Sequence, residues 1–426
     1  MRIFFAICAL ISFSFAAKTH YDLYKLETNQ SAPVLLIIGG IHGNEPGSYF
    51  APSLFISHYK ITKGAVWVVP NLNRDSIIKF ERGIYGDMNR KFSVIAPNDP
   101  DLTVINDIKK VITDKRVAIV LNLHDGHGFY RPKFINDKMN PSAWGQATII
   151  DQKKLDGVKY GELAEIASKV TTKTSVITTN EIHEFNVKNT ETKEKDEQMR
   201  QSLTFFAINN SKPAFGVETS KNIDSLSTKT TYQLKAFEEF MIIAGIEFKR
   251  DFELNQQTVE KLIAERGTLK LSDKFEIPLN DIRAKIEHIP YDGKFQYSSN
   301  NPNVTLLKDG NVIGVYNGFK KITILTLDNT PYDSSLKESV AVVDAKETKA
   351  QLGSLISVQK DILFKANSGY RLNMIGFNGS NIDESDIKVS LKDFDKKYSL
   401  DSAGKIYRAE FYKDKAFCGA IIIKFQ

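Results

Sequence analysis

The sequence predicts an α/β domain followed by two small all-β domains. Up to about residue 250, continuous aliphatic runs alternate with amphipathic segments of helical period, which is typical of a mostly parallel or mixed sheet flanked by helices. Beyond residue 250, short apolar runs are separated by polar turns, which favours small β modules. The length of 426 residues suits two or three domains.

The first half is expected to supply the central strands and their covering helices. Strand–helix alternation of this kind implies a largely parallel sheet. Asp99 and Pro100 are the expected cap and first turn of one helix, and Gly245 is the expected end of another. The expected strands are residues 34–38, 65–69, 117–123 and 214–217, and the expected helices lie within 48–59, 100–112, 163–170 and 234–244.

The second half has the pattern of two β domains. Residues 304–307 and 312–316 flank an Asp-Gly turn and predict a hairpin. Further short strands are expected at 322–327, 355–358, 362–364, 387–391, 407–411 and 420–425. We therefore expect an α/β domain over residues 17–250, a barrel-like β domain over 251–344 and an Ig-like β-sandwich over 345–426.

The amino terminus has the features of a secretory signal peptide. Arg2 precedes an apolar run over residues 3–15, and small residues stand before a cut that would leave Ala17 first, which makes residues 1–16 the signal peptide. The run is too short for an ordinary membrane-spanning helix, and an uncleaved anchor is the alternative. Cleavage would leave Cys418 as the only thiol, so we expect no internal disulfide and a buried Cys418. The predicted product is exported, with no stable membrane insertion.

The charge of the chain is mildly basic. Lys and Arg number 57 against 51 Asp and Glu, a formal net charge of +6 spread over the whole length. This excess is too dilute to indicate nucleic acid as a partner, and it is compatible with an anionic polymer.

The sequence contains a candidate zinc site at the ends of two predicted strands. His42 and Glu45 follow residues 34–38 across a glycine-rich turn, and this spacing can aim an imidazole and a carboxylate at one point. A zinc site that keeps one position open needs three protein ligands. His124, at the end of residues 117–123, is the favoured third ligand, because a strand end holds a side chain more rigidly than a loop does. His127 is its competitor.

The remaining catalytic groups are expected at the same edge. Glu218 ends the fourth aliphatic run and can act as base for a water molecule, with an ordinary surface glutamate as the alternative. The turn-like segment 82–90 carries Arg82, Asn89 and Arg90, and arginine can grip a carboxylate or polarise a carbonyl. Arg74 is a rival for either arginine role.

These motifs, in this order over residues 39–220, resemble the zinc carboxypeptidase superfamily, clan M14. Together with the β-rich tail, the chain is similar to the periplasmic, cell-shape-determining peptidoglycan D,L-carboxypeptidases of helical Gram-negative bacteria, which have two small β domains. The resemblance implies one Zn²⁺ held by His42, Glu45 and His124. It further implies that murein tripeptide stems are trimmed to dipeptides by release of meso-diaminopimelate from the γ-carboxyl of D-glutamate, which influences cell shape.

The resemblance also implies roles for individual residues. Glu218 would deprotonate the attacking water and later protonate the leaving amine. Asn89 and Arg90 would hold the terminal carboxylate of the substrate, and Arg82 would polarise the scissile carbonyl. The tyrosine-bearing loop of the digestive enzymes is not recognisable after Glu218, so Trp144 is the candidate for an aromatic wall, with loop packing as its other reading.

Two other functions are compatible with parts of this pattern. A deacylase resembling succinylglutamate desuccinylase and aspartoacylase would share the His-x-x-Glu, the distant histidine and the Asn-Arg pair. The predicted signal peptide and the long β tail argue against that cytoplasmic class. A murein-binding scaffold that retains an inactive peptidase fold would lack a ligand or the base, and the sequence lacks neither.

Overall fold

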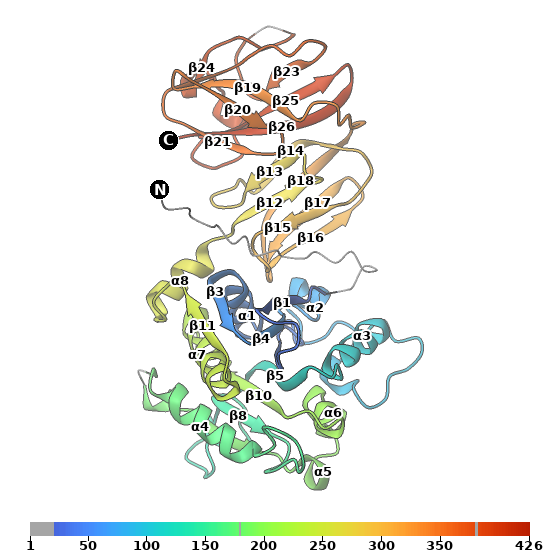
Figure 1. The fold of residues 1–426 in the computed structure, drawn as a ribbon, viewed down its shortest axis with the longest axis vertical. Helices are drawn as coiled ribbons and strands as arrows, with labels where there is room; N and C mark the ends of the chain where they lie inside the picture. The colour runs from blue at the N-terminus through green and yellow to red at the C-terminus, as the bar shows by residue number, and fades with distance from the viewer. Residues whose placement is uncertain (1–20, 179, 380–381) are drawn as a thin grey trace.

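The computed structural model describes residues 21–178, 180–379 and 382–426. The expected signal peptide therefore lies outside the described residues. Within them, no helix combines the length and the apolar character needed to cross a membrane. Figure 1 shows an α/β unit at one end of the long axis and two β-rich units stacked above it.

The α/β unit is built on a seven-stranded mixed sheet with the order β1-β4-β2-β5-β10-β8-β9. The neighbours β4, β2, β5 and β10 run parallel, β1 and β8 pair antiparallel to this group, and β9 runs parallel to β8. All four predicted strands are present, and the mostly parallel character is confirmed. The bounds are β1 (Tyr24–Glu27), β2 (Val34–Ile38), β4 (Ala65–Val69), β5 (Val117–Gly126), β8 (Ala147–Ile150), β9 (Asn186–Asn189) and β10 (Ala214–Ser220).

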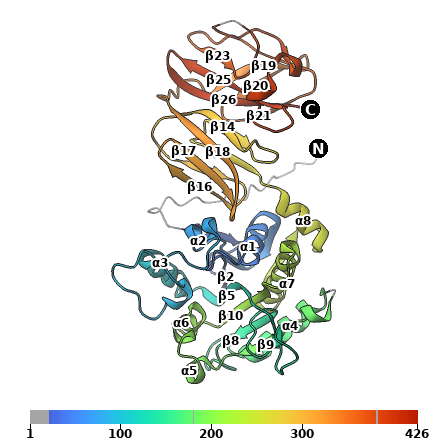
Figure 2. The same cartoon turned by 180° about the vertical axis from the view of Figure 1, so that it is seen from behind.

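Helices cover both faces of this sheet, which is why its central strands are apolar on both sides. Figure 2 shows α1, α7 and α4 on one side, with α3 and α6 on the other. The helices are α1 (Gly47–His58), α2 (Arg74–Lys79), α3 (Leu102–Ile112), α4 (Leu163–Ser175), α5 (Thr192–Lys195), α6 (Leu203–Asn209), α7 (Leu226–Ala244) and α8 (Gln256–Ala264). Short antiparallel β3 (Tyr59–Lys63) and β11 (Glu247–Arg250) form a separate ribbon, and β6 (Phe129–Tyr130) pairs with β7 (Met139–Asn140).

Two helix ends test the sequence-based expectations. The helix expected from Pro100 begins at Leu102, because Asp99 instead accepts the Asp101 backbone N–H at 2.8 Å and forms a turn ahead of the helix. Helix α7 ends where predicted, at Gly245, whose φ of 71° is the left-handed conformation that glycine adopts without strain.

The described residues of the β-rich part form four sheets, and the predicted hairpin is present as β16 and β17. The run expected at 387–391 is a strand only at β24, because a 3₁₀ turn follows it. The first two sheets are β13-β12-β15 and β14-β18-β17-β16, with β12 (Thr268–Leu271), β13 (Phe275–Pro278), β14 (Lys285–Tyr291), β15 (Tyr297–Ser299), β16 (Val304–Asp309), β17 (Val312–Asn317) and β18 (Lys320–Asn329). The other two are β20-β19-β22-β24 and β21-β26-β25-β23, with β19 (Glu338–Val343), β20 (Lys346–Gln351), β21 (Leu355–Val358), β22 (Asp361–Phe364), β23 (Arg371–Met374), β24 (Val389–Ser390), β25 (Ile406–Lys413) and β26 (Ala416–Phe425).

Strand β26 contributes side chains to the hydrophobic cores of both β-rich units. From Ala420 to Ile423 its side chains alternate between two hydrophobic cores, as on a regular strand, and a β-bulge at Cys418 shifts this alternation nearer the start of the strand. Phe417, Ala420 and Ile422 pack in the core of the first unit, while Ile421 packs in the core of the second. Cys418 lies in that second core and is fully buried, as predicted. The domain limits at residues 250 and 344 stay predictions.

The first β-rich unit rests on the α/β unit beside the start of α1. Asn303 accepts a hydrogen bond from the Ser53 hydroxyl at 2.8 Å, and the Asn71 amide donates to the Pro302 carbonyl at 2.8 Å.

Candidate metal centre

The loop between β2 and α1 holds His42 and Glu45 in a fixed, buried arrangement. Gly40 takes a left-handed conformation with φ of 68°, which turns the chain sharply after the strand. Gly43 lies against the Ser76 carbonyl, where an added Cβ would come within 2.0 Å of the oxygen. Only glycine fits there, and the loop is thereby pressed against α2. His42 and Glu45 are 1% and 2% exposed.

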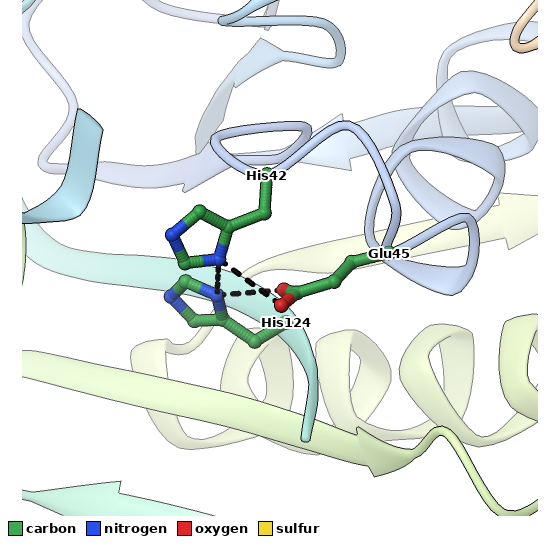
Figure 3. A group of neighbouring side chains, drawn as sticks. All are labelled: His42, Glu45 and His124. Atoms are coloured by element: carbon green, nitrogen blue, oxygen red, sulfur yellow. Dashed lines mark hydrogen bonds and ion pairs between the residues drawn. The ribbon is translucent and has the colours of Figure 1, made fainter. Parts of the chain in front are cut away.

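Figure 3 shows His124 pointing from β5 toward His42 and Glu45. The Nδ1 atoms of the two histidines are 3.2 Å apart. Glu45 Oε1 is 3.1 Å from the His42 Nδ1, and Glu45 Oε2 is 3.0 Å from the His124 Nδ1. The donor atoms of the three residues all lie within 4.8 Å of one another. The predicted ligands therefore converge on one point.

The competing histidine does not share this arrangement. His127 is exposed and lies outside the convergent group, and its backbone carbonyl accepts the backbone N–H of Trp144 at 3.0 Å. Of the two candidates for the third ligand, the geometry favours His124.

The donor set fits a divalent metal of the zinc type. Two imidazoles and one carboxylate leave a fourth position for water or substrate. Burial alone would raise the pKa of Glu45, but the two neighbouring histidines outweigh this effect. The net pKa of Glu45 lies well below its ordinary value, so the carboxylate is ionised. Burial lowers the pKa of His124, which favours the neutral ring that a metal requires.

Asp87 supports His42 from behind and was missed by the sequence analysis. Its Oδ1 lies 2.8 Å from His42 Nε2, and it also accepts the Asn89 backbone N–H at 2.9 Å. A carboxylate on Nε2 leaves Nδ1 as the unprotonated nitrogen facing the other donors. Burial raises the pKa of Asp87, and its bond to His42 and the charge of Arg82 outweigh that effect, so the net pKa is lowered. Asp87 stands two residues before the Asn-Arg pair, a weak signal that could have found it.

Glu218 lies beside the three donors on the neighbouring strand. It pairs with His124 in the β5–β10 register and is 7% exposed. Its Oε2 is buried and has no hydrogen-bond partner among the described residues. Burial raises its pKa well above the ordinary value, and the nearby Glu45 and Asp125 carboxylates add to the shift. This carboxyl is suited to exchange a proton.

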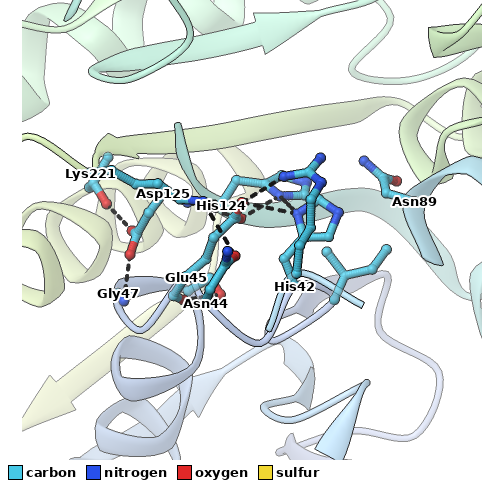
Figure 4. Close-up of polar contacts among 12 residues, drawn as sticks. His42, Asn44, Glu45, Gly47, Asn89, His124, Asp125 and Lys221 are labelled. Atoms are coloured by element: carbon cyan, nitrogen blue, oxygen red, sulfur yellow. Dashed lines mark hydrogen bonds and ion pairs between the residues drawn. The ribbon is translucent and has the colours of Figure 1, made fainter. Parts of the chain in front are cut away.

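Two cations approach the centre from its exposed side. Arg82 donates to Glu45 Oε1 at 3.1 Å and to Asp87 Oδ2 at 3.0 Å. Lys221, which follows β10, lies 3.3 Å from the same Glu45 oxygen and 3.3 Å from Asn44 Oδ1. Figure 4 shows Lys221 and Asn89 on opposite sides of the cluster. The sequence analysis named Arg82 and missed Lys221.

The Asn-Arg pair lies on the 3₁₀ turn capped by Asp87. Asn89 is buried, and its Oδ1 accepts the Leu203 backbone N–H at 3.0 Å. Arg90 is half-buried and donates to the Asn89 carbonyl at 3.1 Å. The rival Arg74 pairs with Asp22 and is turned to a different neighbour.

Trp144 stands at the exits of β5 and β10. Its side chain is half-buried, and an added Cβ on Gly126 would lie 2.6 Å from the Trp144 Cβ. The next residue, Gly145, packs on Ser220. Both neighbours are two residues beyond the strand positions of His124 and Glu218, so the backbone of Trp144 lies at the same edge of the sheet as the candidate centre.

Fold and site together define a class of protein. A mixed α/β sheet that carries a buried His–Glu–His group, with a carboxyl of raised pKa beside it, has the components of a metal-dependent hydrolase. The chain belongs to the family of carboxypeptidases controlling helical cell shape, whose catalytic domain matches residues 1–264. Residues 332–426 match the C-terminal domain of metallo-carboxypeptidase. The predicted family and enzyme class are confirmed.

Solved structures agree with this assignment. The crystal structure of apo cell shape determinant protein Csd4 from Helicobacter pylori is 37% identical, covers 95% of this chain and 100% of that chain, and has a TM-score of 0.88. The tripeptide-bound form of the same protein gives the same values. The mDAP-bound form of Csd4, named as a D,L-carboxypeptidase, is 38% identical with a TM-score of 0.89 and covers 94% of this chain and 100% of that chain. Among curated proteins no match was found.

Proposed function

We propose that this chain is a zinc-dependent D,L-carboxypeptidase of the periplasm. Its substrate would be the murein tripeptide stem, from which it releases meso-diaminopimelate and leaves a dipeptide, thereby influencing cell shape. The observation that carries the proposal is the convergence of His42, Glu45 and His124 beside Glu218. It is supported by the 38% identity to a D,L-carboxypeptidase solved with mDAP bound.

In this proposal, residues 17–250 carry the reaction and the zinc is held by His42, Glu45 and His124. Zinc, when bound, supplies a Lewis acid that lowers the pKa of water and polarises a carbonyl. Glu218 accepts a proton from the attacking water at its buried carboxylate. It then donates that proton to the leaving amine of diaminopimelate, which breaks the amide bond to D-glutamate.

The arginines and the amide would position the substrate. Arg90 and the amide N–H group of Asn89 hold the terminal carboxylate, because guanidinium and amide N–H groups are donors to carboxylate oxygens. Arg82, which reaches the centre from its exposed side, donates to the carbonyl oxygen as negative charge develops there. Trp144 forms a wall for the side chain of the leaving residue.

The decisive experiment is mass spectrometry of murein tripeptide before and after incubation with the zinc-loaded protein. Loss of one diaminopimelate supports the proposal, whereas loss of D-alanine from a longer stem contradicts it. N-acyl-aspartate and N-succinylglutamate, tested in parallel, should remain intact; their cleavage in place of the tripeptide would favour a deacylase.

The variant Glu218→Gln separates catalysis from scaffolding. It should reduce turnover by roughly a thousandfold or more while zinc remains bound, because the amide cannot take up a proton. The matched control is Glu165→Gln on α4, an exposed glutamate whose partner among the described residues is Lys169. Full rescue of cell shape by the inactive Glu218 variant would favour a murein-binding scaffold.

Export by the segment 1–16 is the remaining part of the proposal. Fusion of residues 1–20 to a reporter that is active only outside the cytoplasm should give activity. Replacing the apolar run with polar residues should abolish it. An active reporter with the altered segment would contradict the signal-peptide assignment.

A further inference from the structure

A half-buried lysine ammonium is held against the candidate aromatic wall, Trp144. Lys188 of β9 donates to the carbonyls of Pro141 at 2.9 Å and Ala143 at 2.8 Å. The same Nζ lies 4.3 Å from the ring centroid of Trp144 and 4.9 Å from that of Tyr130. Two carbonyls and two π faces therefore surround the charge, and the cation is fixed in place before any substrate arrives.

Strand pairing brings this lysine to the catalytic edge of the sheet. Lys188 pairs with Ile149 of β8, and Ile149 pairs with Gly216 of β10, two residues before Glu218. Residues two apart on a strand face the same side. The long side chain of Lys188 thus extends on the face that carries Glu218 and reaches the loop of Trp144.

The charge of Lys188 acts on the centre across a poorly solvated region. Burial lowers the pKa of Lys188 to about 8, and the negative charge of Glu218 works against that shift. The amine is therefore protonated in most molecules at pH 7. Electrostatic interactions are stronger in such a partly buried site than in water.

We propose that Lys188 determines side-chain specificity at the leaving residue. Acting through Trp144 and through its own charge, it selects a side chain whose distal end carries a carboxylate and discriminates against one that ends in an ammonium alone. The inference rests on the proposed function. Lys188 would thereby distinguish two leaving residues. Diaminopimelate carries a carboxylate beside its distal ammonium, whereas lysine carries the ammonium only.

The discrimination follows from the positive charge of Lys188 beside the Trp144 indole. In the proposed function Glu218 protonates the leaving amine and Trp144 lines the side chain of the leaving residue, so that side chain would begin beside Glu218 and meet the indole that Lys188 contacts. A cation on one face of the indole reduces the attraction of the other face for a second cation. A bare lysine ammonium meets this like charge, whereas the distal carboxylate of diaminopimelate is attracted to it.

The test compares two tripeptides, L-Ala-γ-D-Glu followed by either meso-diaminopimelate or L-lysine. The measured quantity is the ratio of their kcat/KM values for wild type, Lys188→Met and Lys188→Arg. We expect wild type to prefer the diaminopimelate tripeptide. The methionine variant, which keeps the aliphatic stem without the charge, should reduce the ratio by about tenfold, and arginine should retain most of it.

The ratio distinguishes specificity from a merely structural role. If Lys188 only supported the loop, Lys188→Met would lower both kcat/KM values by the same factor, and that result overturns the proposal. Lys188→Gln, which retains N–H donors without charge, gives the same test if methionine prevents folding. Lys169→Met on the surface of α4 is the control and should leave the ratio unchanged.

Failure of the two proposals gives different results. If wild type cleaves neither tripeptide, the proposed function is wrong and this inference falls with it. If wild type releases diaminopimelate and the neutral variants keep the wild-type ratio, the proposed function stands and the role of Lys188 is refuted.

Discussion

Replacing Asp87 with alanine should weaken zinc binding more than any change of equal size elsewhere in the same loop. The Asp87 carboxylate accepts from His42 Nε2 at 2.8 Å and from the Asn89 backbone N–H at 2.9 Å, and it pairs with Arg82 at 3.0 Å. Its removal leaves His42 free to rotate and to carry its proton on the nitrogen that faces the other donors. Loss of such a partner lowers metal affinity by roughly 10- to 100-fold, or about 1.4 to 2.7 kcal/mol.

The assay is a competition titration of zinc against a chromogenic chelator. Asp99→Ala is the matched control, because Asp99 also accepts a backbone N–H, from Asp101, and also pairs with a cation, Lys91. It lies outside the contacts of His42, so its zinc affinity should stay within about twofold of wild type. Asp87→Asn should fall between the two, since the amide oxygen still caps the turn without the charge.

Unchanged zinc affinity in Asp87→Ala, with the protein folded, would refute this reasoning. It would mean that packing alone orients the His42 ring. A fall in kcat without a change in zinc affinity would instead indicate that Asp87 acts by positioning Arg82.

Three further results are expected. Burial raises the pKa of Glu218 above 4.5, so its ionised fraction grows as the pH rises through that raised value, and kcat/KM should increase with pH on the acidic side. A midpoint at or below pH 4.5 in the profile of kcat/KM would contradict this prediction. Gly43→Ala should impair zinc binding, measured by the same titration, because the new Cβ would lie 2.0 Å from the Ser76 oxygen; wild-type affinity would show that the loop can shift without cost. Phe417→Ala should destabilise the β-rich units by about 3–5 kcal/mol in urea unfolding, because the Phe417 ring stacks on Phe275 at a centroid distance of 4.8 Å. Zinc affinity should stay unchanged. Loss of zinc affinity together with the loss of stability would indicate that the β-rich units unfold together with the α/β unit.

The convergent donors could be predicted from the sequence because each is tied to a strand end. A continuous aliphatic run identifies a central strand, and the residue that follows it lies at the edge where ligands bind. His42 and Glu45 follow one such run, while His124 and Glu218 end two others. In a parallel sheet these ends meet, so four side chains far apart in the sequence could be expected together.

Asp87 and Lys188 could not be predicted in the same way. Asp87 lies in an irregular turn whose approach to His42 depends on how α2 packs, and packing of that kind leaves no periodic pattern. Lys188 lies on β9, a short half-buried strand whose polar sequence lacks the aliphatic signal of the central strands. Strand β8 was missed because Thr148 interrupts its apolar residues and leaves only Ile149 and Ile150 as a continuous aliphatic stretch.

The shared strand β26 shows how a correct local prediction can leave the tertiary arrangement open. Its apolar run predicted a strand, and continuous hydrophobicity indicates that both faces are covered. Which two cores cover it depends on contacts with β12–β18 on one side and β19–β23 on the other. The stacking of Phe417 on Phe275 and the pairing of Ile422 with Leu355 join residues far apart in the sequence, beyond what a local pattern can specify.

The division of labour between Glu45 and Glu218 follows from the pairing of β5 with β10. Glu218 faces His124 across the two strands, which brings a second carboxyl close to Glu45 in a buried site. Two neighbouring carboxyls cannot ionise independently. The histidines lower the pKa of Glu45, while burial and the charge of Glu45 raise that of Glu218, so one group stays charged as a ligand and the other can exchange a proton. A slip of β10 by one residue would turn Glu218 to the opposite face and remove the base without touching a ligand. Strand register is therefore as much a part of the proposed catalytic apparatus as the side chains themselves.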